Sequence, residues 1–240
     1  MGKKITILIL MAFASTLILM MPTQTKAANE TFSITNPGPA SKPSKWTAET
    51  PQPGDIGGAN FTFYNVTTPL NSTFFINVTV SGVTQMKAWG IGVIYDNTTL
   101  QYVSAWRPTD HVFKGVEDLG TSMVAPAVVV ADYNATHQEI QWGCAYIMPD
   151  PPWTFNGTGV LCQIQFRIIA PVNDTEWVAQ FNWDPDWTAV YYHPTGNEVP
   201  NLQPGYAVYK IPEFTTIALL SLLATASAVI VIAKNRNKRD

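Results

Sequence analysis

The densest group of side chains with binding chemistry lies in residues 181–193, FNWDPDWTAVYYH. Sugar rings stack on exposed aromatic faces, because the C–H faces of a sugar are apolar and its rim is polar. The carbohydrate-binding candidates are Trp183, Trp187, Tyr191 and Tyr192. Trp183 also shares an alternating register with Trp177 and Phe181, which favours a core position. Trp187, which follows an Asp-Pro-Asp turn, is therefore the better candidate.

The acidic and histidine side chains give weaker signals. Asp184 and Asp186 have the oxygen ligands that calcium prefers, but there is no EF-hand or dockerin loop, so an Asp-capped turn is the stronger interpretation. His111, His137 and His193 stand far apart without a metal-binding spacing such as HExxH. No nucleophile elbow, P-loop or dinucleotide fingerprint occurs. We therefore expect no cofactor, no metal and no catalysis; a polysaccharide-degrading enzyme is the least favoured alternative.

Two cysteines, Cys144 and Cys162, lie in the alternating segments EIQWGCAYI and GVLCQIQFRII. Each falls on the apolar side of its segment. In an oxidising compartment such a pair predicts a disulfide, whereas two cysteines without a CxxC do not make a zinc site.

Nine N-x-S/T sequons indicate a glycosylated exterior. They are at Asn29, Asn60, Asn65, Asn71, Asn77, Asn97, Asn134, Asn156 and Asn173. Asn77 lies in TFFINVTV, whose alternation places it on the side opposite Ile76 and Val78. We expect that strand to be buried on one face and glycosylated on the other.

The two ends of the chain predict secretion and membrane attachment. Residues 1–27 have a basic start, a long apolar run and small residues near position 27, as in a signal peptide; an uncleaved anchor is the alternative. Residues 215–233 carry no charge and would span about 28 Å as a helix. The basic residues 234–240 then stay in the cytoplasm. We expect a single-pass protein of the cell membrane with its domain outside the cell.

The segment between the ends is acidic and rich in short strands. Residues 56–207 contain four basic and twelve acidic side chains, a net charge of −8. This charge repels phosphate, so no nucleic-acid partner is expected. Residues 28–55 are Pro-rich and predict a linker. Short alternating segments separated by Gly, Pro, Asn and Asp predict an all-β sandwich over residues 56–207.

Two stretches resemble cohesin-like domains. Residues 74–106 contain apolar alternation, then Tyr95-Asp96, a turn and Leu100; residues 157–170 contain Gly159, a small apolar pair and an inward Phe166. The resemblance implies a jelly-roll β-sandwich related to some cellulose-binding modules. It also implies non-catalytic binding, since cellulosomal cohesins hold dockerin modules.

The C-terminal segment IPEFTTIALL resembles the PEF-type sorting tails of archaeal surface proteins. The resemblance implies cleavage near Pro212, Glu213 and Phe214 and replacement of the tail by a lipid. A plain transmembrane helix is the alternative that we favour slightly. In either case residues 208–214 hold the domain near the membrane.

Together these features predict a membrane-tethered, extracellular cohesin-like module that binds a protein module or a polysaccharide at the cell surface. The alternative from another class is a structural glycoprotein of the envelope without a discrete ligand. An exposed aromatic or apolar patch on the folded domain would favour the binding module.

Overall fold

The computed structural model describes residues 30–37, 57–118, 122–147, 154–173, 175–192 and 196–211. These residues form thirteen strands and one short helix, so the predicted all-β class is confirmed. The predicted signal helix and the predicted transmembrane helix both lie outside the described residues. Within the described part of the chain, no helix is long and apolar enough to cross a membrane.

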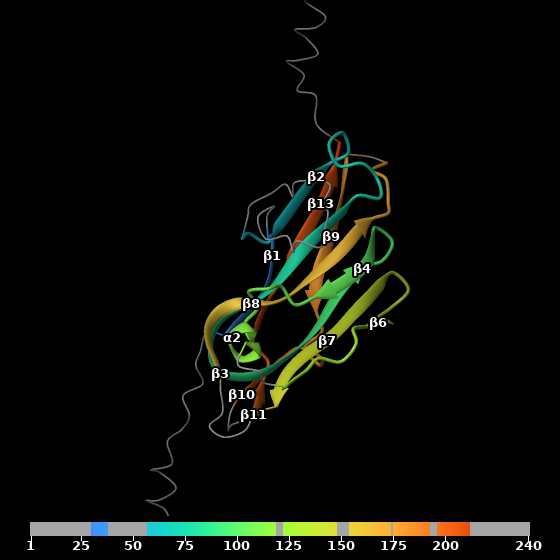
Figure 1. Ribbon diagram of the computed structural model, residues 1–240. Coiled ribbons are helices and arrows are strands. Elements are labelled where there is room, and N and C mark those ends of the chain that lie inside the picture. Colours follow the sequence, from blue (N-terminus) through green and yellow to red (C-terminus); the bar gives the residue numbers. More distant parts are fainter. Residues whose placement is uncertain are drawn as a thin grey trace, which may run out of the picture.

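The strands form one continuous hydrogen-bonded network that folds into two layers (Figure 1). The first layer contains β1 (Thr31–Thr35), β4 (Leu100–Trp106), β8 (Phe155–Ile168) and β12 (Asn201–Gln203). The second contains β5 (Ser122–Val124), β6 (Val129–Asp132), β7 (His137–Ile147), β10 (Ala189–Tyr192) and β11 (Gly196–Glu198). Three further strands continue the same hydrogen-bonded network. They are β9 (Glu176–Trp183), β13 (Gly205–Lys210), which pairs with β9, and β2 (Asn60–Tyr64), which pairs with β13.

The long strand β3 (Thr73–Asp96) belongs to both layers. Its N-terminal half, residues 73–80, pairs with β8 and β1, and its C-terminal half, residues 88–96, pairs with β7, β9 and β10. Between the halves, Gly82 and Gln85 have φ angles of 72° and 57°, and the pairing with β8 shifts register. This irregular segment lets the strand leave one layer and enter the other.

The core lies between the layers and is rich in aromatic rings. The ring of Phe166 on β8 lies 5.0 Å from Tyr95 on β3 and 5.0 Å from Phe181 on β9. Phe74 adds rings packed at 4.7 Å to Phe63 and 5.8 Å to Phe61. Each such buried ring contributes roughly 1.5–3 kcal/mol relative to an exposed one.

The turn between β3 and β4 has the form that its sequence predicts. The backbone N–H and the hydroxyl of Thr98 both donate to Asp96 Oδ1, at 2.8 Å and 2.6 Å. Asp side chains commonly close turns in this way. Tyr95 before the turn and Leu100 after it are both buried in the core, so this motif marks the strand ends.

Both boundaries of the domain differ from the prediction. Residues 31–35, within the predicted linker 28–55, form β1, and their Phe32 and Ile34 are fully buried. Alternation within TFSIT was masked by the Pro-rich sequence that follows it. At the other end β13 reaches Lys210, beyond the predicted boundary at 207.

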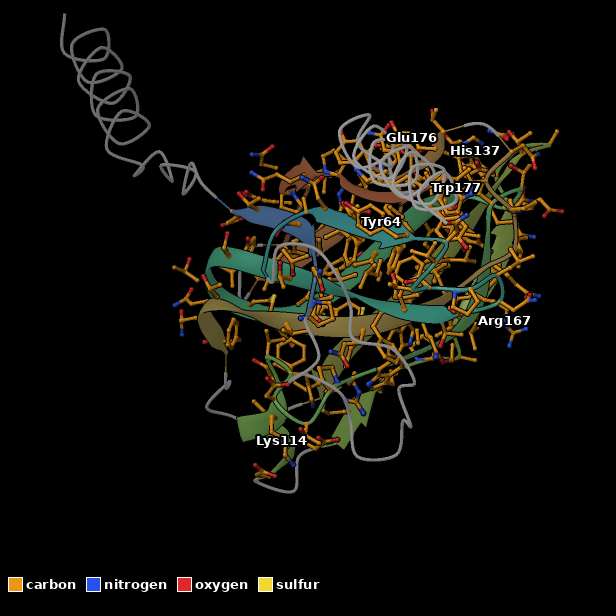
Figure 2. The ribbon with its side chains drawn as sticks, turned by 90° about the horizontal axis from the view of Figure 1, so that it is seen from above. Tyr64, Lys114, His137, Arg167, Glu176 and Trp177 are labelled. Atoms are coloured by element: carbon orange, nitrogen blue, oxygen red, sulfur yellow. The ribbon has the colours of Figure 1, made fainter. Side chains whose placement is uncertain are left out.

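A short helix, α2 (Lys114–Glu117), closes the side of the domain opposite Glu176 and Trp177 (Figure 2). His111 beside it is buried, and its Nε2 lies 3.2 Å from Glu117 Oε2. Burial lowers the pKa of His111, while the hydrogen bond to His111 lowers the pKa of Glu117. Arg107 also contacts Glu117, at 3.5 Å. This cluster attaches α2 to the sandwich.

Candidate binding pocket

A pocket of about 530 Å³ opens on the outer face of the β10–β3–β7 layer; we call it the aromatic pocket. Its floor is made of small residues, because Ala88 on β3 pairs with Ala145 on β7, and Gly90 pairs with Gly143. Trp89, between Ala88 and Gly90, points into the core and is 1% exposed. Alternation along β3 therefore places the large side chains inside and leaves a shallow floor outside.

One wall of the aromatic pocket carries two aromatic side chains that face solvent. Trp187 is 54% exposed and Tyr191 is 44% exposed. Tyr191 lies on β10 directly opposite Ala88, so its ring stands beside a methyl group instead of another large side chain. Large apolar side chains exposed beside a cavity are typical of binding surfaces.

The opposite wall is formed by the end of β5, the connection from β5 to β6 and the start of β6. It contributes Val124, Pro126 and Val129, which are all apolar. The indole N–H of Trp142 donates to the carbonyl oxygen of Pro126 at 2.9 Å and so fixes this wall to β7. Gln141 is the lining residue with a polar amide group. The cavity therefore offers apolar contact with few hydrogen-bonding groups.

Trp187 is held in place by residues 184–188, the connection from β9 to β10 that we call the strap. The backbone N–H of Asp184 donates to the Gly92 carbonyl oxygen at 2.9 Å, and the N–H of Gly92 donates to Thr188 Oγ1 at 3.1 Å. A Cβ atom on Gly92 would lie 2.8 Å from Trp187 Cβ, and one on Gly90 would lie 3.1 Å from the Trp187 carbonyl oxygen. The strap can therefore lie on β3 only because glycines are beneath it.

The strap is also the Asp-capped turn that its sequence predicts. The backbone N–H of Asp186 donates to Asp184 Oδ1 at 2.9 Å. Among the described residues, no group of three or more His, Cys, Asp or Glu side chains is placed to hold a metal ion. Beneath the strap lies Glu139, which is 4% exposed; burial raises the pKa of its carboxyl group, and Asp184 raises it further.

The four aromatic candidates separate into two groups. Trp187 on the strap and Tyr191 on β10 both line the aromatic pocket. Trp183 is 7% exposed, and its indole N–H donates to the Gln203 carbonyl oxygen at 2.9 Å, so the prediction that it contacts sugar is wrong. Tyr192 packs partly buried against the core, and burial raises the pKa of its hydroxyl.

Sequence reasoning missed the pocket floor and the opposite wall. The floor had a local signal, since AWGIG on β3 alternates large residues with small ones. The wall at Val124, Pro126 and Val129 had none, because its position depends on which strand β5 and β6 pair with.

The structure does not contain the predicted disulfide between Cys144 and Cys162, because both residues are free thiols in it. Each is buried on the apolar side of its strand, as expected. However, β7 and β8 do not pair with each other: Cys144 lies opposite Trp89 on β3, and Cys162 lies opposite Val78. Burial raises the pKa of both thiols.

The sequons differ in accessibility. Exposed asparagines are Asn60, Asn65, Asn71, Asn134, Asn156 and Asn173, and Asn97 is partly exposed. Asn29 lies outside the described residues. The predicted glycan at Asn77 is contradicted, because Asn77 is 8% exposed and its Oδ1 accepts a hydrogen bond of 2.8 Å from Gln163. The other sites stay predictions.

No family model and no curated protein matches the chain. Solved structures do resemble it. A chain of a type I cohesin–dockerin complex from Clostridium thermocellum is 8% identical, with a TM-score of 0.47, over 79% of this chain and 99% of that chain. A non-cellulosomal cohesin from the hyperthermophilic archaeon Archaeoglobus fulgidus is 9% identical, with a TM-score of 0.43, over 79% and 96%.

A third similar structure is the sixth cohesin of Acetivibrio cellulolyticus scaffoldin B, solved in complex with a dockerin. It is 12% identical, with a TM-score of 0.42, over 77% of this chain and 98% of that chain. All three of these similar structures contain cohesins, the family that the two sequence motifs resemble. At these identities the likeness concerns the fold alone, and the aromatic pocket and the strap are features of this chain's own residues.

Proposed function

We propose that the domain is a non-catalytic binding module that holds a partner protein by an apolar side chain seated in the aromatic pocket. The observation that carries this proposal is the pocket itself, with half-exposed Trp187 and Tyr191 beside a floor of alanine and glycine. Buried aromatic anchors and apolar pockets supply most of the affinity in protein interfaces. Exposed aromatic side chains that gather beside an apolar cavity, unlike single ones, are typical of interaction sites.

The lining favours a protein side chain over a polysaccharide. A sugar ring needs hydrogen-bonding partners for its hydroxyl groups as well as a stacking face. The wall offers no side-chain hydrogen-bonding group at Val124, Pro126 or Val129. The amide group in the lining belongs to Gln141. That two of the similar solved structures come from cohesin–dockerin complexes also supports a protein partner.

We further propose that this binding takes place outside the cell. The support is in the sequence: the signal-like residues 1–27, the uncharged residues 215–233 and the exposed sequons. The tail near Pro212, Glu213 and Phe214 would either cross the membrane or be exchanged for a lipid. Either form would keep the aromatic pocket at the cell surface.

The test compares the full chain with a Trp187→Ala variant. Each is immobilised and offered proteins extracted from the cell surface and, separately, insoluble polysaccharides. We expect one or a few proteins to bind the natural chain, identified by mass spectrometry. Trp187→Ala should weaken that binding at least about tenfold, the loss of about 1.4 kcal/mol typical of an interface anchor.

The matched control is Tyr133→Ala, since Tyr133 is 53% exposed but does not line the pocket. It removes an exposed ring of similar size and should bind as the natural chain does. Equal binding by Trp187→Ala would overturn the proposal. Retention by a polysaccharide alone would assign the pocket to sugar, and binding to neither would favour a structural glycoprotein.

A further inference from the structure

A buried acidic side chain lies beneath the strap, where the binding proposal gives it no role. Glu139 on β7 is 4% exposed, with Ile94 of β3 and Ala131 of β6 as its strand neighbours. Its Oε2 accepts a hydrogen bond of 2.9 Å from the Gln141 amide. Its Oε1 is fully buried, and no described group donates a hydrogen bond to it. A buried carboxylate oxygen without a donor is costly.

The group that faces Glu139 is a second carboxyl group, on Asp184 of the strap. Both side chains lie against Gly92 of β3. A Cβ atom added there would contact Glu139 Oε1 and would lie 2.9 Å from Asp184 Cβ. Asp184 uses Oδ1 to accept the backbone N–H of Asp186. The two carboxyl groups therefore meet above a glycine, on the element that positions Trp187.

Among the described residues, no lysine or arginine is a strand neighbour of this pair, and the titratable residue on the same face of β7 is His137, two positions before Glu139. The β3 and β6 neighbours of Glu139 are Gly92, Ile94 and Ala131, none of which ionises. The strap adds Asp184 and, two residues later, Asp186, which are both acidic. Glu139 is buried and Asp184 is half-buried. Two carboxylates held this close repel each other, and such pairs keep one proton between them.

The expected ionisation agrees with this geometry. Burial is the largest cause that raises the pKa of Glu139 above its ordinary value of 4.5, and the charge of Asp184 and a hydrogen bond to Asp184 raise it further. The hydrogen bond from Gln141 acts in the opposite direction; it is a smaller effect than burial but a larger one than either effect of Asp184, so burial decides the direction. Glu139 is therefore the member of the pair that keeps its proton as the pH rises.

We propose that Glu139 donates a shared proton to Asp184, and that this hydrogen bond latches the strap onto β3 and holds Trp187 in the wall of the aromatic pocket. When the proton leaves to solvent, two carboxylates remain and their repulsion lifts the strap. The latch is complete at acid pH and is lost as pH rises through the raised pKa of Glu139. As regulation of the aromatic pocket, this inference rests on the proposed binding function.

The experiment follows Trp187 directly in the full chain without any partner. The protein is labelled with 5-fluorotryptophan, which gives one fluorine signal for each of its eight tryptophans. The signal of Trp187 is assigned by its loss in Trp187→Phe. Spectra are recorded from pH 4 to pH 9. We expect the Trp187 signal to move in a single step whose midpoint lies above 4.5, the ordinary value for glutamate.

Three variants decide the cause of that step. Glu139→Gln supplies a permanent amide donor to Asp184, so its Trp187 signal should stay at the acid position at every pH. Asp184→Asn removes the second carboxylate and should also abolish the step. The matched control, Asp186→Asn, removes a neighbouring carboxylate of the same strap and should keep the step of the natural chain.

Two results would overturn the proposal. One is a Trp187 signal that does not move with pH, or that moves equally in Glu139→Gln. The other is a signal that responds to added calcium chloride but not to protons, which would mean that a cation neutralises the pair. Because no partner is present, failure of the latch leaves the binding proposal intact. Conversely, a working latch in a chain that captures nothing would count against the binding proposal alone.

Discussion

The two halves of β3 carry the same alternation but differ in what lies outside them. In the N-terminal half, Phe74 and Ile76 point into the core, yet Phe75 and Asn77 on the other face are buried as well. The outer face there is covered by large and amide side chains: the ring of Phe75 lies 5.4 Å from Trp106.

In the C-terminal half the inner face is equally apolar, but the outer face carries Ala88, Gly90 and Gly92. Small residues leave room, and this room holds the strap and the aromatic pocket. The difference shows that alternation predicts which face of a strand is buried in the core but does not predict whether the other face is covered. The size of the outer side chains decides whether that second face closes or stays open for binding.

The largest expected effect is on the inner face of the N-terminal half. Phe74→Ala removes a ring that is 1% exposed and contacts four other rings. We expect the free energy of unfolding to fall by about 3–5 kcal/mol, measured by chemical denaturation. Val178→Ala is the control, because Val178 is 53% exposed and should change stability by less than about 0.5 kcal/mol. A loss below about 1 kcal/mol at Phe74 would contradict the shared aromatic core.

The outer face of the same half should respond next. Asn77→Ala deprives the Gln163 amide of its acceptor and should cost about 1–3 kcal/mol of stability. Asn65→Ala at an exposed sequon should cost less than about 0.5 kcal/mol. Glycopeptide mass spectrometry of the natural chain should find Asn77 unmodified. A glycan at Asn77 would show that this face is open after all.

In the C-terminal half, Gly92→Ala should disturb the pocket more than the core. The new Cβ would lie 2.8 Å from Trp187 Cβ, so the strap must lift. We expect a stability loss of about 1–3 kcal/mol, as for other overpacked sites, together with weakened partner binding. The control Gly115→Ala places its methyl group in open space and should leave binding unchanged. Unchanged binding by Gly92→Ala would separate the strap from the pocket.

The pH dependence of stability is a finer test of the same half. The folded-state pKa of Glu139 is raised, so its contribution to stability is complete in acid and is lost as pH rises through that pKa. The slope for one proton is at most about 1.4 kcal/mol per pH unit. Denaturation curves of Glu139→Gln should lose this part of the slope, and those of Asp186→Asn should keep it. Parallel curves for Glu139→Gln and the natural chain would refute the assignment.

The smallest effect is expected from reductant. Cys162 lies opposite the N-terminal half of β3 and Cys144 opposite the C-terminal half, and both are free and buried. Reductant should leave the melting temperature unchanged. If the two cysteines formed a disulfide, reductant would break it and the melting temperature would fall. Iodoacetamide should modify neither thiol in the folded chain and both after unfolding in guanidinium, because buried thiols with raised pKa react slowly.

Local patterns predicted those features that depend on neighbouring residues. Alternation around Ile76 and Phe166 identified the buried faces of β3 and β8, and Asp96 identified a turn. Two features failed locally. The buried strand TFSIT was assigned to the linker, because five residues beside a Pro-rich segment carry too weak a period. Trp183 was ambiguous, because the same alternation fits an inner and an outer position.

The sequence by itself determined the all-β class, the inner faces of the long strands, the strap turn and the exposed Trp187. Only the tertiary structure decided that β3 pairs with both β7 and β8, that Cys144 and Cys162 lie on strands of different layers as free thiols, and that Asn77 is covered. The physical reason is that side-chain alternation is set by each residue's own backbone. The second face of a strand is set by residues far along the chain, whose positions depend on strand order and on the bend in β3.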